Sequence, residues 1–362
     1  MDITKLIKKF KVEGEVVTSN HKHGEGRIHS TEVVVLDNTH KYILQRINHH
    51  VFPNVEGLMN NIIYVTEFIQ DKVRKQGRDP RRKTLNLVNT VDNKPCYYVA
   101  EEDAYYRVYE YIKDSIEHQS LSDPEDFYWC GRAFGSFALL LSDFDATKLV
   151  DVIPNFHNTK VRYEHLLEVI NKDEHDLVKT AKEEIEFVMQ RAKDTEVVVN
   201  LLKDGTIPTH VTHNDPKLNN ILFDSLTGKP LCVIDLDTVM SGSLLYDYGD
   251  AIRYGANLAG EDEQDLSKVH FDLEYFKAFS RGYINKLGEN LTEKEKEYLP
   301  EGIKTMTLEL GIRFLDDYLN GSKYFGIDYP THNLIRARVQ LKLVKEIEEK
   351  FDEMKAYVLS CK

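Results

Sequence analysis

Short apolar runs separated by turn residues dominate the first hundred residues, and this pattern predicts strands. Residues 31–36 and 41–47 flank the polar turn 37–40, an arrangement that is typical of a hairpin. A short helix is predicted before them, over residues 3–10. The remaining strands of this predicted sheet are 85–90, 95–100 and 105–112.

Apolar residues recur at helical spacing between the hairpin and the later strands, which predicts a helix over residues 55–76. The residues of this apolar stripe are Leu58, Ile62, Val65, Ile69 and Val73. Beyond residue 112 the pattern changes to long helices. They are predicted over 126–142, 160–170, 176–202, 265–287, 293–319 and 331–359.

The change of pattern near residue 112 divides the chain. A chain of 362 residues is long for one hydrophobic core, so two lobes are expected. The N-terminal lobe, 1–112, is predicted to be a small antiparallel sheet with one helix. The C-terminal lobe, 113–362, is predicted to be mainly helical, and the fold class is therefore α+β.

Amino-acid composition and net charge limit the classes of protein to which the chain can belong. The apolar fraction of 41% is typical of a globular protein. A formal net charge of −13 argues against a nucleic-acid partner, because phosphates demand basic surface. The basic segment 78–83 is interpreted as a solvated loop, with phosphate binding as the alternative.

The cysteines and the apolar segments bear on the environment of the protein. None of the four cysteines forms a CxxC pair, so reduced thiols are expected. No apolar segment approaches about 18 residues, so no membrane span is expected. We therefore expect a cytoplasmic enzyme without a membrane partner.

The most informative motif is the polar string 213–220, His-Asn-Asp-Pro-Lys-Leu-Asn-Asn. Asp215 suits the group that accepts a hydroxyl proton in phosphoryl transfer. The amide oxygen of Asn220 and the carboxylate of Asp235 suit Mg²⁺, a hard cation that prefers oxygen ligands. The motif therefore predicts an ATP- and Mg²⁺-dependent kinase centre.

A predicted hairpin supports this interpretation. The apolar runs 221–223 and 231–234 flank the turn 224–230, so Asn220 precedes the hairpin and Asp235 follows it. Such a hairpin would bring the two proposed metal ligands together. The alternatives are a turn Asp, a strand-capping Asn and a buried structural Asp. The pair Asp235–Asp237 also matches the DxD of sugar-nucleotide transferases, but that interpretation leaves 213–220 unexplained.

These motifs resemble the aminoglycoside phosphotransferase and choline kinase superfamily of small-molecule kinases. Within it, the strings of residues 153–166, 212–256 and 332–344 resemble the N-acetylhexosamine 1-kinases. The resemblance is strongest over roughly residues 130–345. It implies a two-lobed, protein-kinase-like fold.

The nucleotide half of a kinase site is expected in the N-terminal lobe. Gly24 and Gly26 lie where a glycine-rich loop would cover the phosphates of ATP. Arg46 takes the place of the usual strand-three lysine, with Lys41 as the alternative, and Glu67 is its candidate helix partner. Arginine at this position departs from most of the superfamily.

Two further parts of the kinase site are predicted: the hinge that joins the lobes, and the site that binds the acceptor. Glu110 and Ile112, at the end of the last strand, are expected to form the hinge that contacts adenine. The resemblance assigns sugar contacts to Tyr254, Arg313 and Tyr324, together with Asp215. Each of these side chains has an ordinary packing or ion-pair role as its alternative.

The function expected from these observations is transfer of the ATP γ-phosphate to the 1-hydroxyl of an N-acetylhexosamine, GlcNAc or GalNAc. The partners are then a small sugar and ATP, without nucleic acid. Two alternatives stay open. One is a related kinase acting on another sugar, an aminoglycoside, choline or homoserine. The other is a nucleotide-binding pseudokinase, which the intact Asp215, Asn220 and Asp235 argue against.

Overall fold

The computed structural model describes residues 2–21, 29–118 and 120–361. The chain forms two compact units, and each is described by itself. Unit 1 comprises Met1–Ile116, Thr147–Ile153 and Leu222–Met240. Unit 2 comprises Glu117–Ala146, Pro154–Ile221 and Ser241–Lys362.

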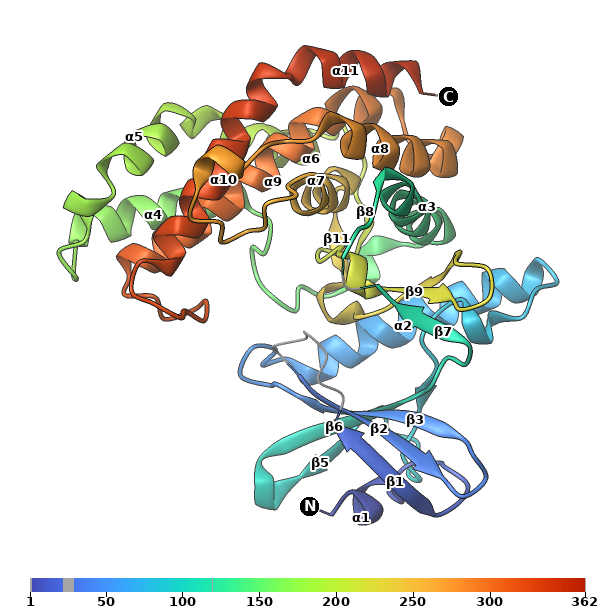
Figure 1. Cartoon of the computed structure of the whole chain (residues 1–362). Coiled ribbons are helices and arrows are strands. Elements are labelled where there is room, and N and C mark those ends of the chain that lie inside the picture. The colour runs from blue at the N-terminus through green and yellow to red at the C-terminus, as the bar shows by residue number, and fades with distance from the viewer. Residues whose placement is uncertain (1, 22–28, 119, 362) are drawn as a thin grey trace. The chain divides into compact units, whose positions relative to one another are not determined.

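An antiparallel sheet forms the centre of unit 1 (Figure 1). Its strands are ordered β1-β2-β3-β6-β4, and β5 pairs with β6. Their bounds are β1 (Val16–His21), β2 (Ser30–Leu36), β3 (Lys41–Ile47), β4 (Leu87–Val88), β5 (Tyr97–Val99) and β6 (Ala104–Glu110). The predicted hairpin is β2-β3. Strand β1 was not predicted, because an edge strand can be polar and still pair through its backbone.

Helices cover the apolar side chains of unit 1. Helix α1 (Ile3–Ile7) contributes Leu6 and Ile7 to a core that also contains Leu44 of β3 and Val108 of β6. Helix α2 (Val55–Lys75) buries the apolar stripe predicted from the sequence. Its start is capped by the Asn54 side chain, which accepts from the Gly57 backbone N–H at 2.9 Å.

A second, three-stranded sheet has the order β10-β9-β7. Its members are β7 (Ser115–Glu117), β9 (Ile221–Asp224) and β10 (Pro230–Val233). The hairpin predicted after Asn220 is therefore present. Its turn is closed by the Asp224 carboxylate, which accepts from the Thr227 backbone N–H at 2.8 Å.

Unit 2 is mainly helical (Figure 1). Strand β8 (His210–Thr212) pairs with β11 (Met240–Gly242). The helices are α3 (Pro124–Leu140), α4 (Thr159–Lys172), α5 (Lys182–Gln190), α6 (Val197–Lys203), α7 (Leu244–Gly255), α8 (Leu273–Leu287), α9 (Glu293–Leu319), α10 (His332–Glu349) and α11 (Phe351–Ser360).

The predicted helix 293–319 has the bounds of α9. The predicted helix 331–359 is instead two helices, α10 and α11, which meet at Lys350. The predicted helix 176–202 is likewise broken into α5 and α6. An antiparallel N-terminal sheet followed by a helical C-terminal part confirms the α+β class.

Helix α7 was not predicted, because its sequence mixes aromatic, acidic and glycine residues. It is nevertheless buried against α9. A side chain at Gly249 would come within 2.3 Å of the Gly302 carbonyl oxygen, so only glycine allows this close approach. Within the described residues, no helix combines the length and apolarity that crossing a membrane requires.

Candidate active site

The loop that follows β8 carries Asp215 and is held by its backbone. The backbone N–H groups of His213 and Asn214 each donate to the Asp247 carboxylate at 2.7 Å. Asp247 lies on α7 and is buried. Asn214 has a positive φ of 64°, a conformation that needs support from surrounding contacts. The two bonds to Asp247 supply that support and fix the direction in which the chain enters Asp215.

The His213 side chain braces the same loop. It is fully buried, and its ring meets the edges of Phe134 and Phe137 on α3 at centroid distances of 5.6 and 5.8 Å. Its Nδ1 accepts from the Asp215 backbone N–H at 3.3 Å. This bond and the packing against α3 hold the loop that leads to Asp215.

Asp215 lies between two polar partners. Its Oδ1 is 2.7 Å from Lys217 Nζ, and Asn220 Nδ2 donates to its backbone oxygen at 2.8 Å and to Oδ2 at 3.3 Å. The side chain remains 29% exposed, so a substrate hydroxyl has access to it. The amide assignment of Asn220 follows from these bonds and leaves Oδ1 as its acceptor atom.

Lys217 places a positive charge beside Asp215. Burial alone would lower the pKa of Lys217, but the Asp215 carboxylate, with Asp250 and Glu261 contributing, raises it above its ordinary value. The ammonium group is therefore charged at neutral pH. The charged ammonium group lies 2.7 Å from the Asp215 carboxyl group, which it orients.

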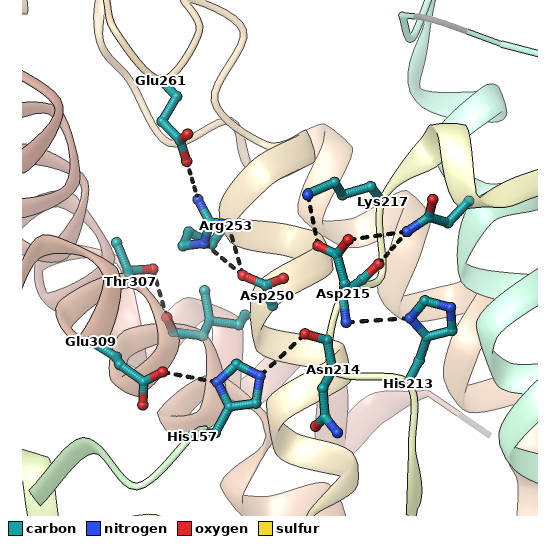
Figure 2. A network of polar contacts seen from close by, with 12 residues as sticks. His157, His213, Asn214, Asp215, Lys217, Asp250, Arg253, Glu261, Thr307 and Glu309 are labelled. Carbon is teal, nitrogen blue, oxygen red and sulfur yellow. Dashed lines mark hydrogen bonds and ion pairs between the residues drawn. The ribbon is translucent and has the colours of Figure 1, made fainter. Parts of the chain in front are cut away.

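A buried histidine connects the Asp215 loop to α9 (Figure 2). His157 Nδ1 lies 2.8 Å from Glu309 Oε1, and its Nε2 lies 3.3 Å from the Asn214 backbone oxygen. The Thr159 hydroxyl donates to the other Glu309 oxygen at 2.6 Å. Burial by itself would raise the pKa of Glu309, but His157, Arg313 and Thr159 hold it below its ordinary value.

A second acidic side chain on α7 is neutralised. Arg253 donates through Nε and Nη2 to Asp250 Oδ1 at 2.9 and 2.7 Å, and through Nη1 to Glu261 at 2.9 Å (Figure 2). Burial would raise the pKa of Asp250, yet Arg253 lowers it. Asp250 is therefore an ionised carboxylate whose charge is balanced within the protein.

Two of the predicted sugar contacts lie together. The Arg313 guanidinium carbon is 5.9 Å from the Tyr324 ring centroid, 5.5 Å from that of Phe325 and 5.4 Å from that of Phe156. Phe156 adjoins His157, which contacts the Asp215 loop. The cluster thus connects to the predicted base through the adjacent residues Phe156 and His157.

Tyr254, the third predicted sugar contact, lies on α7 and is exposed.

Unit 1 contains a buried cation that the sequence analysis did not identify. Arg107 on β6 is 2% exposed and forms a bidentate ion pair with Asp237, which His29 Nε2 also approaches at 3.1 Å. Arg107 Nε donates to Gln45 on β3 at 2.9 Å. An arginine within a predicted strand of mainly apolar and aromatic residues was the signal available in the sequence.

Asp235, the predicted metal ligand, lies near Arg107. Burial by itself would lower the pKa of the Arg107 guanidinium, but Asp237 and Asp235 raise it above its ordinary value. The pKa of Tyr109 is raised by burial and by the same two carboxylates. Asp235 has a positive φ of 58°, so both segments that carry predicted catalytic carboxylates contain a left-handed residue that is not glycine.

Arg46 lies on the other face of the sheet. In the β3-β6 register, Gln45 is opposite Arg107 and Arg46 is opposite Tyr106. Arg46 shares its face with Leu44, which packs against α1. Arg46 is exposed, and its Nη2 lies 3.4 Å from the Glu102 carbonyl oxygen.

The structure therefore does not bring Arg46 together with its predicted helix partner. Glu67 is exposed on α2, and both side chains belong to the described residues without an ion pair between them. The face that carries Arg107 and Asp237 is opposite to the one predicted for phosphate contacts. The phosphate-binding role of Arg46 stays a prediction that this placement does not favour.

The predicted hinge residues differ in burial. Ile112 is buried in an apolar cluster with Leu222 and Cys232. Glu110 is exposed, and its backbone N–H donates to the Asn86 carbonyl at 2.9 Å, so that donor is already used. Gly24 and Gly26 lie outside the described residues.

Comparison with known proteins agrees with the kinase motif. The profile of the phosphotransferase enzyme family (APH) matches residues 92–283, which is more than half of the chain. Among solved structures, a microcompartment-associated aminopropanol kinase is 16% identical, with 96% of each chain covered and a TM-score of 0.60. An aminoglycoside phosphotransferase from Alicyclobacillus acidocaldarius is 14% identical, with 99% of this chain and 95% of that chain covered and a TM-score of 0.58.

A third similar structure is a spectinomycin phosphotransferase in complex with ADP and spectinomycin. It is 12% identical, with 99% of this chain and 97% of that chain covered and a TM-score of 0.56. At these identities the structures establish the fold, and the matched profile establishes the family. The chain belongs to the phosphotransferase enzyme family.

Proposed function

We propose that this protein transfers the γ-phosphoryl group of ATP to the anomeric 1-hydroxyl of an N-acetylhexosamine, GlcNAc or GalNAc. The observation that carries the proposal is the cluster of Arg313 and Tyr324, which connects through Phe156 and His157 to the loop of Asp215. This cluster offers hydrogen-bond donors and ring faces to an uncharged, hydroxylated acceptor.

Asp215 acts as the proton acceptor in this proposal. Its side chain is partly exposed and is held by Lys217 and Asn220. An anomeric hydroxyl is more acidic than an ordinary alcohol, so modest assistance from a carboxylate suffices. Lys217 orients Asp215, and in this proposal its positive charge stabilises the negative charge of the transferred phosphoryl group.

Mg²⁺ is the proposed metal ion. The Asn220 bonds to Asp215 are made by its nitrogen, so the amide oxygen is the atom that suits a hard cation. The Asp235 carboxylate is the proposed second ligand. When bound, the ion would supply charge neutralisation for the phosphates.

ATP is the proposed phosphoryl donor, with its site in the N-terminal lobe, 1–112, and the acceptor site in the C-terminal lobe, 113–362. The buried apolar cluster around Ile112 suits an adenine ring. The bound ADP of the similar spectinomycin phosphotransferase supports an adenine nucleotide. Glu110 supplies backbone groups at the hinge in this proposal, and Gly24 and Gly26 cover the phosphates.

Two of the segments that resemble N-acetylhexosamine 1-kinases contribute residues to the proposed acceptor site. Residues 153–166 supply Phe156 and His157, beside Arg313 and the Asp215 loop. Residues 332–344 supply Arg336, whose Nη1 donates to the Gly326 carbonyl at 2.9 Å, in the segment that carries Tyr324. Distant parts of the sequence thus share one location within unit 2.

The charges of this region favour an uncharged acceptor over an aminoglycoside, choline or an amino alcohol. A cationic substrate requires unbalanced negative charge near the base. Arg253 balances one of the two carboxylates Asp250 and Glu261, and Lys217 places a further positive charge beside Asp215. Glu309 is hydrogen-bonded to His157. Arg313 adds positive charge and, together with burial, lowers the pKa of Arg162.

The test is ADP release measured with a panel of acceptors and purified enzyme. The panel contains GlcNAc, GalNAc, glucose, galactose, kanamycin, choline and homoserine. We expect an N-acetylhexosamine to give the highest kcat/KM and phosphorus NMR to show an anomeric phosphate coupled to H-1. A 6-phosphate product, or faster turnover of kanamycin or choline, contradicts the substrate assignment and leaves the kinase assignment intact.

The same panel addresses the alternative of a pseudokinase. A protein that binds Mg-ATP but releases no ADP above background with any acceptor is a nucleotide-binding module.

A further inference from the structure

We infer that Asp317 is a positioning residue that fixes Tyr324 for the acceptor, an inference that rests on the acceptor site proposed above. Asp317 lies on α9, one helical turn after Arg313. It is 5% exposed, and its carboxylate binds backbone N–H groups and the Asn333 side chain. Its function is to hold the segment 321–326.

The Asp317 carboxylate binds three successive backbone N–H groups of this segment. Oδ1 accepts from Lys323 at 2.9 Å and from Tyr324 at 2.8 Å, and Oδ2 accepts from Phe325 at 2.9 Å. Charge-assisted bonds of this kind are stronger than bonds between neutral groups. The carboxylate therefore determines the path of the backbone through Tyr324.

Helix α10 completes the arrangement. Asn333 is fully buried, and its Nδ2 donates to Asp317 Oδ2 at 2.9 Å. Its Oδ1 accepts from Arg336 Nη1 at 3.1 Å, and the same Nη1 donates to the Gly326 carbonyl at 2.9 Å. Both ends of the segment around Tyr324 are thus bound to side chains of rigid helices.

The contrast between backbone and side chain indicates a function. A surface segment is ordinarily mobile and needs no buried carboxylate. Here Tyr324 is 65% exposed as a whole residue, although its backbone N–H is bound to a buried group. The ring lies 5.9 Å from the Arg313 guanidinium carbon. Asp317 therefore sets the distance between two proposed acceptor contacts without touching the acceptor itself.

The neighbouring Asp316 offers a matched control. It is on the same helix and carries the same charge, but its Oδ1 pairs with His165 Nδ1 at 2.7 Å and not with the segment 321–326. We therefore compare Asp317→Asn with Asp316→Asn. In the Asp317 variant one carboxylate oxygen becomes an NH₂ group, which cannot accept from a backbone N–H.

We expect Asp317→Asn to raise the KM for the acceptor by about tenfold or more, because loss of positioning costs on this order. The KM for ATP should stay within about twofold, and kcat should change less than the acceptor KM. Hydrogen exchange should show lost protection at the amides of residues 323–325. Asp316→Asn should leave the acceptor KM and this protection unchanged.

The acceptor in this test is the compound that the wild-type enzyme phosphorylates fastest. An error in the proposed substrate therefore appears in the wild-type panel, whereas an error about Asp317 appears only in the variants. An unchanged acceptor KM, or lost protection throughout unit 2 with a matching rise in the KM for ATP, overturns the inference. The second result would show that Asp317 stabilises unit 2 as a whole and does not specifically position Tyr324.

A milder variant keeps the inference testable if Asp317→Asn does not fold. Asn333→Ala keeps the carboxylate and its three backbone bonds and removes the side-chain bond at 2.9 Å. We expect the acceptor KM to rise by about threefold, less than the effect of losing a backbone bond. An acceptor KM equal to that of the wild type in this variant would overturn the inference by itself.

Discussion

His157 Nδ1 lies 2.8 Å from Glu309 Oε1, and both side chains are almost completely removed from solvent. Glu309 is on α9, one turn before Arg313, whereas the other ring nitrogen of His157 contacts the backbone next to Asp215. One buried pair therefore couples the proposed acceptor helix to the proposed base. Such a pair is costly to break because each partner is left in a non-polar environment.

Glu309→Gln should lower the free energy of unfolding at pH 7 by about 2 kcal/mol, the scale of a lost hydrogen bond to a charged group. Urea denaturation measures this difference. Glu289→Gln, at an exposed position, is the control and should be within about 0.5 kcal/mol of the wild type.

The same pair predicts a pH dependence. The pKa of Glu309 is lowered in the folded protein, so its stabilisation is present above the unfolded value of about 4.3 and is lost as the pH falls through the folded pKa. The stability difference between wild type and Glu309→Gln should therefore narrow below about pH 4.3. A difference that widens on acidification contradicts the assignment of Glu309 as an ionised partner.

Asp215→Asn should lower kcat by about 100-fold or more, since the proton acceptor of the reaction is lost. Binding of ATP should stay near normal, because the loop is held by Asp247 and His213 rather than by the Asp215 side chain. Steady-state kinetics and calorimetry with ATP provide the measurements. Turnover close to that of the wild type would remove Asp215 from the base role.

Asp235→Ala should abolish Mg²⁺-dependent binding of ATP, because the proposed main ligand is a carboxylate. Asn220→Ala should have a smaller effect, since a neutral amide contributes less to binding a divalent cation. Calorimetric titration with ATP is done with and without Mg²⁺, and the metal-free titration is the control. Equal Mg-ATP affinity in wild type and Asp235→Ala would exclude the metal role.

Arg107→Met and Arg46→Met should differ in stability. Arg107→Met leaves Asp237 buried without its bidentate partner, a change that costs about 3–5 kcal/mol. Arg46 is exposed, so Arg46→Met should change the melting temperature little. Thermal denaturation measures both effects.

The KM for ATP of the Arg46 variant then tests its predicted role. Because Arg46 shares a face with Leu44, we expect a change of less than about twofold, within the range of a surface substitution. A large rise in the KM for ATP together with a fall in kcat would restore Arg46 as a phosphate contact, with Glu67 as its partner.

Arg313→Ala and Tyr324→Ala should each raise the acceptor KM more than the KM for ATP. For Arg313→Ala we expect the acceptor KM to rise by about tenfold, because a hydrogen bond from a charged donor to the acceptor is lost. Arg338→Ala on α10 is the control, because its ion pair with Glu184 lies outside the Arg313 cluster. Equal effects on both substrates would contradict an acceptor site at Arg313.

Local sequence patterns determined the α+β class and most elements of this protein. The stripe of α2 and the bounds of α9 follow from helical periodicity, and the β2-β3 hairpin follows from apolar runs and a turn. The contact between Asn220 and Asp215 was also within reach, because the two residues are five positions apart and share one loop. Short-range spacing constrains short-range geometry.

The sequence could not determine whether the sheet face that carries a given charged side chain is buried or exposed. Arg46 and Arg107 are both cations in predicted strands, and only the pairing of β3 with β6 and the packing of α1 decide which one is buried. Similarly, no local pattern around Asp247 identifies the backbone N–H groups of His213 and Asn214 as the donors that its carboxylate accepts from. A buried charge depends on partners that are remote in sequence.

The acceptor region shows the same division most clearly. The sequence selected Arg313 and Tyr324 through a resemblance, but it did not indicate that Asp317 holds Tyr324 or that His157 reaches Glu309. These bonds join residues whose spacing carries no period, so no local pattern signals them. Tertiary structure decides them, because a buried polar group is stable only where folding brings its partner to hydrogen-bond distance.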